Sequence, residues 1–342
     1  MNGYPPDIVD SVRKLVEGRA ELEYVTARIY EYQRANNTAY ARVCERRGVQ
    51  DIRSWRDIPP VHVDSFRHAV MCTGDPTTAE AVFRTSGTTG ELQGTHHILD
   101  LEPYRIASMK GFEDALLRPG MPRLMLSLIG PADALPHSSL ARMVSWAMDR
   151  FGAPGSGHLV SPIDLQKYRD PFLLLGTAFG LAECFQRHPA LRLPPGSAIM
   201  ETGGFKGRYK ELNRSDLHDL YHRAGVPSTH VVGEYGLTEL CSQWYDGQIG
   251  SATCDVAERI YVPAPWARTR ILDAATMDDV APGDAGLLCH LDPINIGSVQ
   301  MILTSDIGRR VALDDGRDGF IYIGRASGAV IRGCSLMDEV VS

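Results

Sequence analysis

The stretch Thr85-Ser86-Gly87-Thr88-Thr89-Gly90 closely follows a short apolar run that ends at Phe83. Its glycines allow a ligand to approach the backbone, and its amide and hydroxyl groups are donors suited to a phosphate. It lacks the Gly-Lys-Ser/Thr ending of P-loop NTPases and the Gly-x-Gly-x-x-Gly of dinucleotide-binding folds. The stretch therefore predicts a phosphate loop of another class. A flexible Gly/Ser/Thr turn is the structural alternative.

A second motif, Gly233-Glu234-Tyr235-Gly236-Leu237-Thr238-Glu239, follows the apolar pair Val231-Val232. Tyr235 offers a flat face for a purine, and Thr238 offers a hydroxyl for a phosphate. Glu239 offers a carboxylate for Mg²⁺, which takes one or two carboxylates together with substrate phosphates. Taken singly, these residues are as well explained by core packing and surface charge. Their spacing favours a nucleotide site.

A third motif, Thr304-Ser305-Asp306-Ile307-Gly308-Arg309, precedes a hairpin that returns to Gly324-Arg325. An acidic residue at the end of a strand can accept hydrogen bonds from both hydroxyls of a ribose. We therefore predict that Asp306 lies at a strand end and binds ribose. A simple turn is the alternative.

In this order, with Gly203-Gly204 between the first two, the motifs are similar to the signatures of adenylate-forming enzymes. That superfamily comprises acyl-CoA synthetases, nonribosomal adenylation domains and firefly luciferase. The resemblance runs from about residue 79 to 325. Further segments are most like the acyl-protein synthetase branch, the LuxE family, whose relatives also occur in natural-product pathways. These segments are Asp57–Val61 with Phe66-Arg67, Pro136–Leu140, Thr202–Arg208 and Arg332–Leu336.

The resemblance implies a role for each matching position, with ATP and Mg²⁺ as cofactors. The loop Thr85, Ser86, Gly87, Thr88, Thr89 and Gly90 would hold the β- and γ-phosphates. Gly203, Gly204, Glu234, Tyr235 and Gly236 would shape the adenine slot. Thr238 and Glu239 would hold the α-phosphate and Mg²⁺, and Asp306 with Arg325 would bind the ribose. His137 would lie beside the substrate carboxylate, although a lone histidine is as often structural.

The same resemblance implies the fold class, which is the large N-terminal domain of adenylate-forming enzymes. This is an α/β body of two layered sheets with a β-barrel subdomain, here expected without the mobile C-terminal domain. The sequence pattern divides the chain into a helical region, an α/β nucleotide-binding body, a β-rich subdomain and a short tail. Their ranges are 1–75, 76–239, 240–326 and 327–342.

Periodicity predicts particular elements within these regions. Apolar spacings of three and four predict a short helix over Val12–Val16 and one long helix over Leu22–Arg47. In the middle region, strands are expected at Ala81–Phe83, Leu124–Ile129, Ala198–Met200 and His230–Val232, with helices at Leu140–Asp149 and Arg214–Arg223. In the third region, turn signals separate strands at Arg268–Leu272, Gly286–Leu291 and Phe320–Ile323.

Composition excludes several other classes. The 342 residues carry 35 Lys+Arg and 42 Asp+Glu, a formal charge of −7, without a basic tract. Nucleic acid is therefore not an expected partner. No apolar run is long enough to predict a membrane span, so we expect a cytoplasmic protein. The seven cysteines form no Cys-x-x-Cys pair, which favours reduced thiols that fill the core.

Two features depart from the superfamily pattern. The phosphate loop usually continues with a lysine before its last glycine, but this chain has Glu91-Leu92-Gln93-Gly94. Arg84, Lys206 and Arg208 are possible substitutes. The second departure is that no lysine follows Lys210, although the superfamily's C-terminal domain supplies one that contacts the carboxylate and the α-phosphate. The acyl-protein synthetase branch is short in the same way.

That branch passes the acyl group to a cysteine near its C-terminus, which makes Cys334 the candidate nucleophile, with Arg332 able to lower its pKa. We therefore predict activation of a carboxylic acid as an acyl-adenylate, followed by transfer to Cys334. The final acceptor would be a partner protein (a reductase or a carrier protein) or coenzyme A. Two alternatives remain. One is a ligase of secondary metabolism that joins an aromatic or alicyclic acid to coenzyme A, a carrier protein or an amine. The other is a protein that binds nucleotide or acyl-adenylate without turnover.

Overall fold

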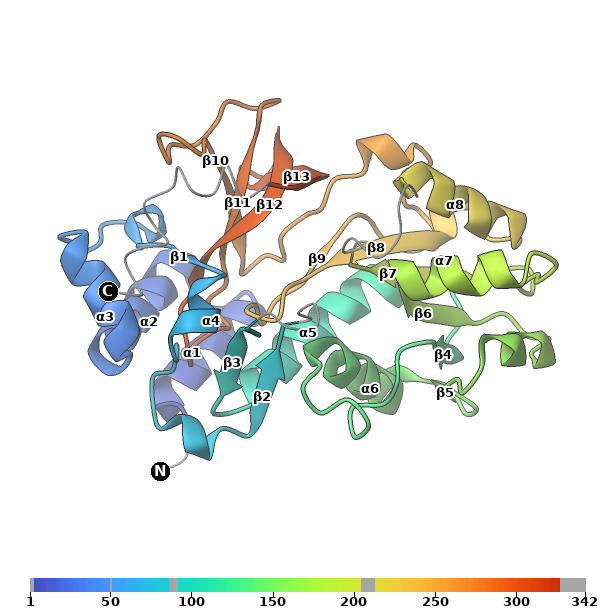
Figure 1. Ribbon diagram of the computed structural model, residues 1–342, viewed down its shortest axis with the longest axis horizontal. Coiled ribbons are helices and arrows are strands. Elements are labelled where there is room, and N and C mark those ends of the chain that lie inside the picture. The colour runs from blue at the N-terminus through green and yellow to red at the C-terminus, as the bar shows by residue number, and fades with distance from the viewer. Residues whose placement is uncertain (1–2, 50, 86–91, 204–212, 327–342) are drawn as a thin grey trace. The chain divides into compact units, whose positions relative to one another are not determined.

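The computed structural model describes residues 3–49, 51–85, 92–203 and 213–326. The chain divides into two compact units that are interleaved along the sequence (Figure 1). The first unit comprises Met1–Ser108, Leu237–Ser242 and Pro263–Ser342, and the second comprises Met109–Gly236 and Gln243–Val262. The boundary passes through the second motif. Gly236 therefore belongs to the second unit, and Leu237 belongs to the first.

A six-stranded sheet with the order β5-β4-β6-β7-β8-β9 forms the base of the second unit. Its strands are β4 (Met125–Ser127), β5 (Gly157–His158), β6 (Leu173–Thr177), β7 (Ala198–Thr202), β8 (Val231–Tyr235) and β9 (Trp244–Tyr245). The pairs from β5 to β8 are parallel, and β9 runs antiparallel to β8. The strands predicted at 124–129, 198–200 and 230–232 are thereby confirmed, each with shifted ends.

Helices cover both faces of this sheet. They are α6 (Ser139–Phe151), α7 (Ala178–Arg187) and α8 (Arg214–Arg223), and α5 (Glu102–Leu116) runs into the second unit from the first. The chain crosses from β4 to β5 in one direction and from β6 through β7 to β8 in the other. Because such crossovers are right-handed, α6 lies on one face and α7 and α8 lie on the other (Figure 1). The predicted helix 214–223 is confirmed to the residue.

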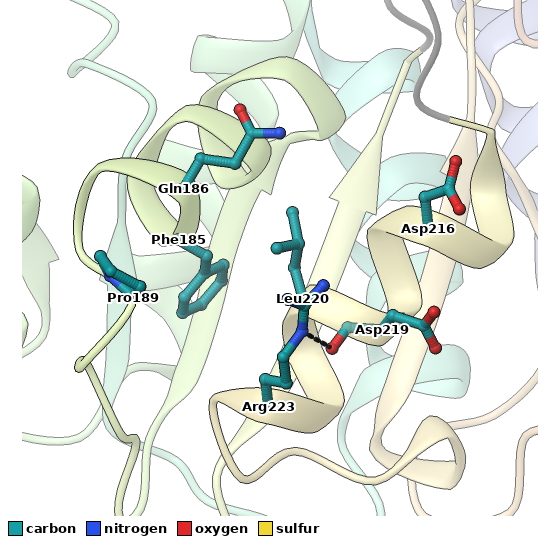
Figure 2. Close-up of a pocket in the computed structure, with 7 residues that line it drawn as sticks. All are labelled: Phe185, Gln186, Pro189, Asp216, Asp219, Leu220 and Arg223. Atoms are coloured by element: carbon teal, nitrogen blue, oxygen red, sulfur yellow. Dashed lines mark hydrogen bonds between the residues drawn. The ribbon is translucent and has the colours of Figure 1, made fainter.

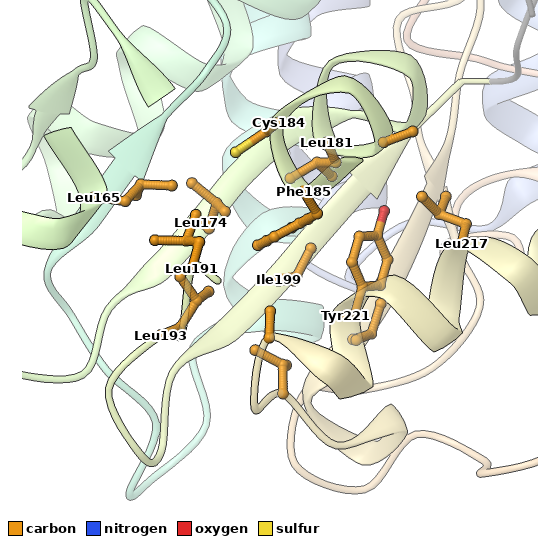
Figure 3. Close-up of a cluster of buried hydrophobic side chains, with 14 of the residues drawn as sticks. Leu165, Leu174, Leu181, Cys184, Phe185, Leu191, Leu193, Ile199, Leu217 and Tyr221 are labelled. Atoms are coloured by element: carbon orange, nitrogen blue, oxygen red, sulfur yellow. The ribbon is translucent and has the colours of Figure 1, made fainter. Parts of the chain in front are cut away.

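The core under α7 and α8 joins these helices to the sheet (Figure 3). Phe185 of α7 and Tyr221 of α8 meet edge to face, with ring centroids 5.8 Å apart. Leu174 and Ile199 rise from β6 and β7 into the same cluster and are fully buried. Burial of each such side chain contributes about 1.5–3 kcal/mol, so packing here holds α8 and the strand ends beside it in place.

The sheet of the first unit follows the path β1-β12-β11-β10, with β13 paired to β12. Its strands are β1 (Val61–His62), β10 (Arg268–Leu272), β11 (Ala285–Leu291), β12 (Met301–Ala312) and β13 (Asp318–Arg325), and a separate hairpin joins β2 (Ala81–Arg84) to β3 (Thr95–Ile98). The predicted antiparallel hairpins are present, and β1 adds a parallel pairing. This pairing places the N-terminal region and the C-terminal strands in one unit.

The helices of the first unit correct one prediction. The long helix expected over Leu22–Arg47 is two helices, because Asn37 leaves the helical conformation and its side chain accepts a hydrogen bond from the Tyr40 N–H. The helices are α1 (Pro6–Val16), α2 (Leu22–Asn36), α3 (Thr38–Arg46) and α4 (Ser65–His68). Single-turn 3₁₀ helices lie at Trp55–Asp57, Pro76–Thr78, Ser228–His230 and Val256–Glu258, and a longer one lies at Pro162–Lys167.

The third motif also differs from its prediction. Thr304–Arg309 lies inside the twelve-residue strand β12, so Asp306 is at mid-strand and not at a strand end. Gly308 lies inside this strand, where a Cβ would be 2.7 Å from the Leu288 side chain, so the close packing favours glycine. Within the described ranges, no helix is long and apolar enough to cross a membrane.

Candidate active site

The β2–β3 hairpin closes the base of the predicted phosphate loop. The Thr85 N–H donates to the Gly94 carbonyl at 3.0 Å, and Thr85 Oγ1 accepts from the Gly94 N–H at 2.9 Å. Thr85 therefore joins the two ends of the loop. The other loop residues of the prediction, Ser86, Gly87, Thr88, Thr89 and Gly90, lie outside the described residues.

A buried histidine ties this hairpin to the second motif. His96, on β3, places Nδ1 2.9 Å from the Thr238 carbonyl oxygen and Nε2 3.0 Å from Asn295 Oδ1. Asn295 in turn donates from Nδ2 to the Glu239 carbonyl at 2.8 Å. The backbone at Thr238 and Glu239 is thus fixed relative to the base of the phosphate loop, within the first unit.

The charge state of His96 follows from its surroundings. Burial is the largest influence and lowers the pKa of His96 to about 4, although its bonds to Thr238 and Asn295 favour the protonated ring. The ring is therefore neutral at pH 7. Because both partners are oxygen atoms, a neutral ring donates to one of them at a time.

Asp292 holds Cys241 and Ser242, which follow Thr238 and Glu239 in the chain. Its carboxylate accepts hydrogen bonds from the Cys241 N–H at 2.6 Å, from the Ser242 N–H at 2.8 Å and from the Ser242 hydroxyl at 2.7 Å. Asp292 is fully buried, and this burial raises its pKa against the lowering effect of those donors. Asn295 and Asp292 therefore anchor the chain between Thr238 and Ser242 from one loop.

The structure brings the predicted ribose pair together. Asp306 and Arg325 are opposite each other in the β12–β13 register, and Arg325 Nε donates to Asp306 Oδ1 at 3.1 Å. The neighbouring Ser305 hydroxyl lies 3.2 Å from His62 Nε2, and His62 Nδ1 accepts from the Asp64 N–H at 3.2 Å. Burial lowers the pKa of His62 more than Asp64 raises it. The role of Asp306 and Arg325 toward a ribose stays a prediction.

In the second unit, Glu234 and Tyr235 end strand β8. The Glu234 side chain is 5% exposed and accepts a hydrogen bond from the Thr202 hydroxyl at the end of β7. Burial raises the pKa of Glu234 to about 7, and the Thr202 bond opposes this shift. The Tyr235 ring packs edge to face on Trp244 and lies 5.9 Å from the Tyr261 ring. Tyr235 is thus a packed aromatic residue as well as a candidate for the adenine slot.

A buried ionic network contacts β7 at Glu201 and β8 at Gly233. Arg214, the first residue of α8, donates to Asp246 and, at 3.2 Å, to Glu201. Asp246 also accepts from the Gly233 N–H at 2.6 Å, and Tyr221 donates to Glu201 at 2.9 Å. Burial raises the pKa of Glu201, but its interactions with His218, Arg214 and Tyr221 outweigh burial and lower the pKa to about 2.

The ionic network restricts position 233 to glycine. A Cβ on Gly233 would collide with Arg214 Nη2 and would lie 2.8 Å from Asp246 Oδ2. The glycine therefore makes room for the ion pair. The network thereby sets the position of the backbone that leads into Glu234.

Four other residues of the predicted site are Gly203, His137, Gly204 and Cys334. Gly203 has a φ of +72°, which favours glycine, and His137 is exposed in the loop before α6. Gly204 and Cys334 lie outside the described residues.

A pocket of about 410 Å³ between α7 and α8 is lined by Phe185, Gln186, Pro189, Asp216, Asp219, Leu220 and Arg223 (Figure 2). It contains none of the predicted site residues.

Comparison with known proteins identifies the family. A family signature described as acyl-protein synthetase, LuxE, matches residues 166–341, which is more than half of the 342-residue chain. The chain belongs to the LuxE family. This LuxE-family chain is 31% identical over 116 residues to a long-chain-fatty-acid–luciferin-component ligase of Aliivibrio fischeri. The alignment covers 32% of this chain and 28% of that protein.

Solved structures agree on the fold. A 2-hydroxyisobutyryl-CoA ligase in complex with 2-HIB-AMP and CoA superposes with a TM-score of 0.62 at 14% identity, over 87% of this chain and 73% of that one. An ATP-bound chimera of RpMatB and BxBclM superposes with a TM-score of 0.52 at 17% identity, over 74% of this chain and 48% of that one. The LuxE-family chain therefore has the mixed α/β fold of the N-terminal part of adenylate-forming ligases, as predicted.

The sequence motifs did not reveal the residues that hold the motif backbone in place. His96 carries a weak signal, because it follows Gly94 by two residues and takes an inward-facing place in an alternating strand. Asn295, Asp292 and Asp246 carry none, since each lies far along the chain from the segment that it holds. Among the described residues, no cluster of three or more His, Cys, Asp or Glu forms a metal site. A single carboxylate such as Glu239 fits Mg²⁺ only together with substrate phosphates.

Proposed function

We propose that this LuxE-family protein activates a carboxylic acid with ATP and then passes the acyl group to a thiol. Family membership supports the reaction class. The observation that carries the proposal is the connection of the phosphate-loop base to Thr238 and Glu239 through His96 and Asn295. This connection holds phosphate-binding groups in fixed geometry, and fixed geometry is the main requirement of phosphoryl and nucleotidyl transfer.

In the first step, a carboxylate oxygen of the acid attacks the α-phosphorus of ATP. The bond from that phosphorus to the bridging oxygen breaks, pyrophosphate leaves and an acyl-adenylate forms. No general base is needed, because the acid is ionised at neutral pH. In the second step, a thiolate attacks the acyl carbonyl carbon, AMP leaves with the electron pair and a thioester remains.

Mg²⁺ fits the donor set when it shares Glu239 with the phosphates of ATP. The ion would neutralise charge as pyrophosphate leaves. Glu239 is 6% exposed, and its backbone carbonyl accepts a hydrogen bond from Asn295, so the backbone that carries this carboxylate is held in place. Thr238 offers its hydroxyl to the α-phosphate, while its carbonyl is occupied by His96.

Cys334 is the proposed acyl acceptor, and the cysteines of the described residues favour it by contrast. Cys44, Cys72, Cys184, Cys241 and Cys289 are buried, and only Cys254 is exposed among them. Burial raises the pKa of Cys241 far above its usual value and that of Cys184 to about 11, which makes both poor nucleophiles at neutral pH. A reductase, a carrier protein or coenzyme A would then accept the acyl group.

The first test is ATP–pyrophosphate exchange with Mg²⁺ across fatty and aromatic acids, together with labelling of the protein by a radioactive acid. We expect exchange with one class of acid, loss of exchange in Thr88→Ala, and retention of exchange in Cys334→Ala. The labelled thioester should disappear in Cys334→Ala and persist in the matched control Cys254→Ala. Absence of exchange with every acid would contradict activation. A label that survives in Cys334→Ala would contradict the acceptor.

His96 is expected to act as a positioning residue. His96→Ala removes the support of the Thr238 carbonyl, and we expect the exchange rate to fall about 100-fold, the size of effect that small misplacements cause. His96→Asn, whose amide nitrogen can replace Nδ1 as a donor, should restore most of the rate. The measurement is kcat and KM for ATP, with thermal unfolding as a check of folding.

His97→Ala is the matched control, because His97 is next on β3 and its side chain takes the opposite face. It should leave kcat close to that of the wild type, because the half-buried His97 ring makes neither of the hydrogen bonds by which His96 contacts Thr238 and Asn295. Equal losses in His96→Ala and His97→Ala would show that the hairpin as a whole, and not the His96 contact, is responsible.

A further inference from the structure

His62 is a buried residue that the proposed chemistry does not use. It is the last residue of β1 and is 3% exposed. Its Nδ1 accepts a hydrogen bond from the Asp64 N–H at 3.2 Å, and its Nε2 lies 3.2 Å from the Ser305 hydroxyl oxygen. Within the first unit, His62 therefore connects the end of β1 to the residue that precedes Asp306.

The surroundings of His62 fix the position of its proton. A ring nitrogen that accepts a hydrogen bond carries no proton, so the neutral ring is protonated at Nε2 and donates to Ser305. Burial lowers the pKa of His62, the Asp64 carboxylate opposes this shift, and the cationic Arg325 and Arg67 add to it. The ring is therefore neutral at pH 7, in the tautomer that donates to Ser305.

β12 is irregular where it carries this serine. Between the paired positions Leu287–Ile307 and Cys289–Leu303, one residue of β11 is opposed by residues 304–306 of β12. Such a bulge interrupts the backbone pairing and turns side chains in a new direction, and bulges are frequent beside active sites. The backbone of residues 304–306 therefore needs support from side chains.

Thr304 supports this bulged segment from the side of β11. Its hydroxyl donates to the Leu288 carbonyl at 2.9 Å and accepts a hydrogen bond from the Asp306 N–H at 3.0 Å. Side-chain hydrogen bonds thus replace part of the backbone pairing at this point. The position of Asp306 depends on these bonds because its own N–H is one of the donors.

Ser305 lies at a junction on the opposite edge of β12. The pairing with β1 ends at Leu303, and the pairing with β13 begins at Asp306. The Ser305 carbonyl accepts a hydrogen bond from the Ala326 N–H at 2.8 Å, which follows β13. The Ser305 hydroxyl contacts His62 of β1. His62 thus supports the bulged segment from the edge that faces away from β11.

We propose that His62 is a positioning residue, which holds the Asp306 carboxylate in its ligand-binding position by donating a hydrogen bond to the Ser305 hydroxyl. The proposal rests on the proposed function, because it assumes that ATP binds with its ribose at Asp306. Arg325 contacts the same carboxylate from an exposed side chain, whereas His62 acts on the buried strand. Loss of the His62 bond should therefore weaken the contacts to the ribose hydroxyls and leave those to the base and phosphates intact.

The test compares ATP with 2′,3′-dideoxy-ATP, which keeps the base and the phosphates but lacks both ribose hydroxyls. Dissociation constants would be measured by calorimetry, together with KM and kcat in ATP–pyrophosphate exchange. In His62→Ala, we expect the affinity for ATP to fall about tenfold, the usual effect of one lost hydrogen bond, and the affinity for the dideoxy analogue to stay unchanged. KM for ATP should rise while kcat changes little, because the ribose is bound equally before and during the reaction.

Two further variants test the hydrogen bond itself. His62→Gln, whose amide nitrogen can replace Nε2 as the donor, should restore most of the affinity for ATP. Ser305→Ala should weaken ATP binding as His62→Ala does, and it leaves almost no cavity. The double variant should be no weaker than either single one, because both changes remove the same contact. Thermal unfolding of each variant verifies that it is folded.

His290→Ala is the matched control. His290 is fully buried in the neighbouring strand β11, and its ring contacts the Thr269 hydroxyl of β10. Its replacement removes an imidazole from the same sheet without touching Ser305, so the ratio of the two nucleotide affinities should stay at the wild-type value. Asp306→Ala is the positive reference and should abolish the preference for ATP.

A ratio that stays at the wild-type value in both His62→Ala and Ser305→Ala would overturn the inference, as would equal weakening of both nucleotides or a wild type without any preference for ATP. If exchange proceeds in these cases, the proposed function stands and only the role of His62 fails. If ATP binds but no acid supports exchange, the proposed function fails, and the nucleotide comparison still decides the role of His62. A wild type that binds neither nucleotide would contradict both.

Discussion

Replacing Glu239 with glutamine is expected to lower the rate of ATP–pyrophosphate exchange by about 100-fold or more. Removing one electrostatic contact to a transition state typically has an effect of this size. The change keeps the size of the side chain and removes the charge that would share Mg²⁺ with the phosphates of ATP. The backbone of residue 239 keeps its bond from Asn295, because that bond is made to the carbonyl. Exchange would be measured over a range of Mg²⁺ concentrations with saturating ATP and acid.

The matched control is Glu258→Gln, since Glu258 is exposed in a 3₁₀ turn. It should leave exchange unchanged. A rise in the Mg²⁺ concentration needed by Glu239→Gln would indicate a weakened metal contact. If Glu239→Gln retains exchange within about threefold of the wild type, the carboxylate neither binds the metal nor stabilises charge in the reaction.

Asp246→Ala is expected to destabilise the protein by about 3–5 kcal/mol, the usual cost of breaking a buried ion pair by removing one partner. The Asp246 side chain is fully buried between Arg214 and Arg259, and it also accepts from the Gly233 N–H. Its removal leaves two guanidinium groups and a backbone donor without that partner. Urea unfolding at pH 7, followed by circular dichroism and by tryptophan fluorescence, would measure the loss.

Asp219→Ala is the matched control within the same unit, because Asp219 is exposed on α8. Its effect should be within about 0.5 kcal/mol. Asp246→Asn keeps an acceptor for Gly233 and should cost less than Asp246→Ala. If Asp246→Ala unfolds at the same urea concentration as the control, the network adds nothing to stability, and Gly233 would need another explanation.

Local sequence predicted the limits of α8 and β10 to the residue. The capping residue Asn213 precedes α8 and Ala224-Gly225 follows it, while Asp273 follows the last apolar residue of β10. The prediction was wrong at Asn37, where one asparagine side chain caps a new helix and breaks an otherwise continuous apolar pattern. It was also wrong to place Asp306 at a strand end, since β12 continues past it to Ala312.

The amino-acid sequence by itself determined the family resemblance, the order of the candidate site motifs and the alternation of strands and helices. These depend on residues close together in the chain, so local pattern is enough to read them. Only the tertiary structure decided that His96 supports Thr238, that Asp246 requires glycine at 233, and that Glu234 is buried beside the Thr202 hydroxyl. Each of these contacts joins segments separated by 13 to 142 residues. Such partners are chosen by the packing of the whole unit, and no local pattern records them.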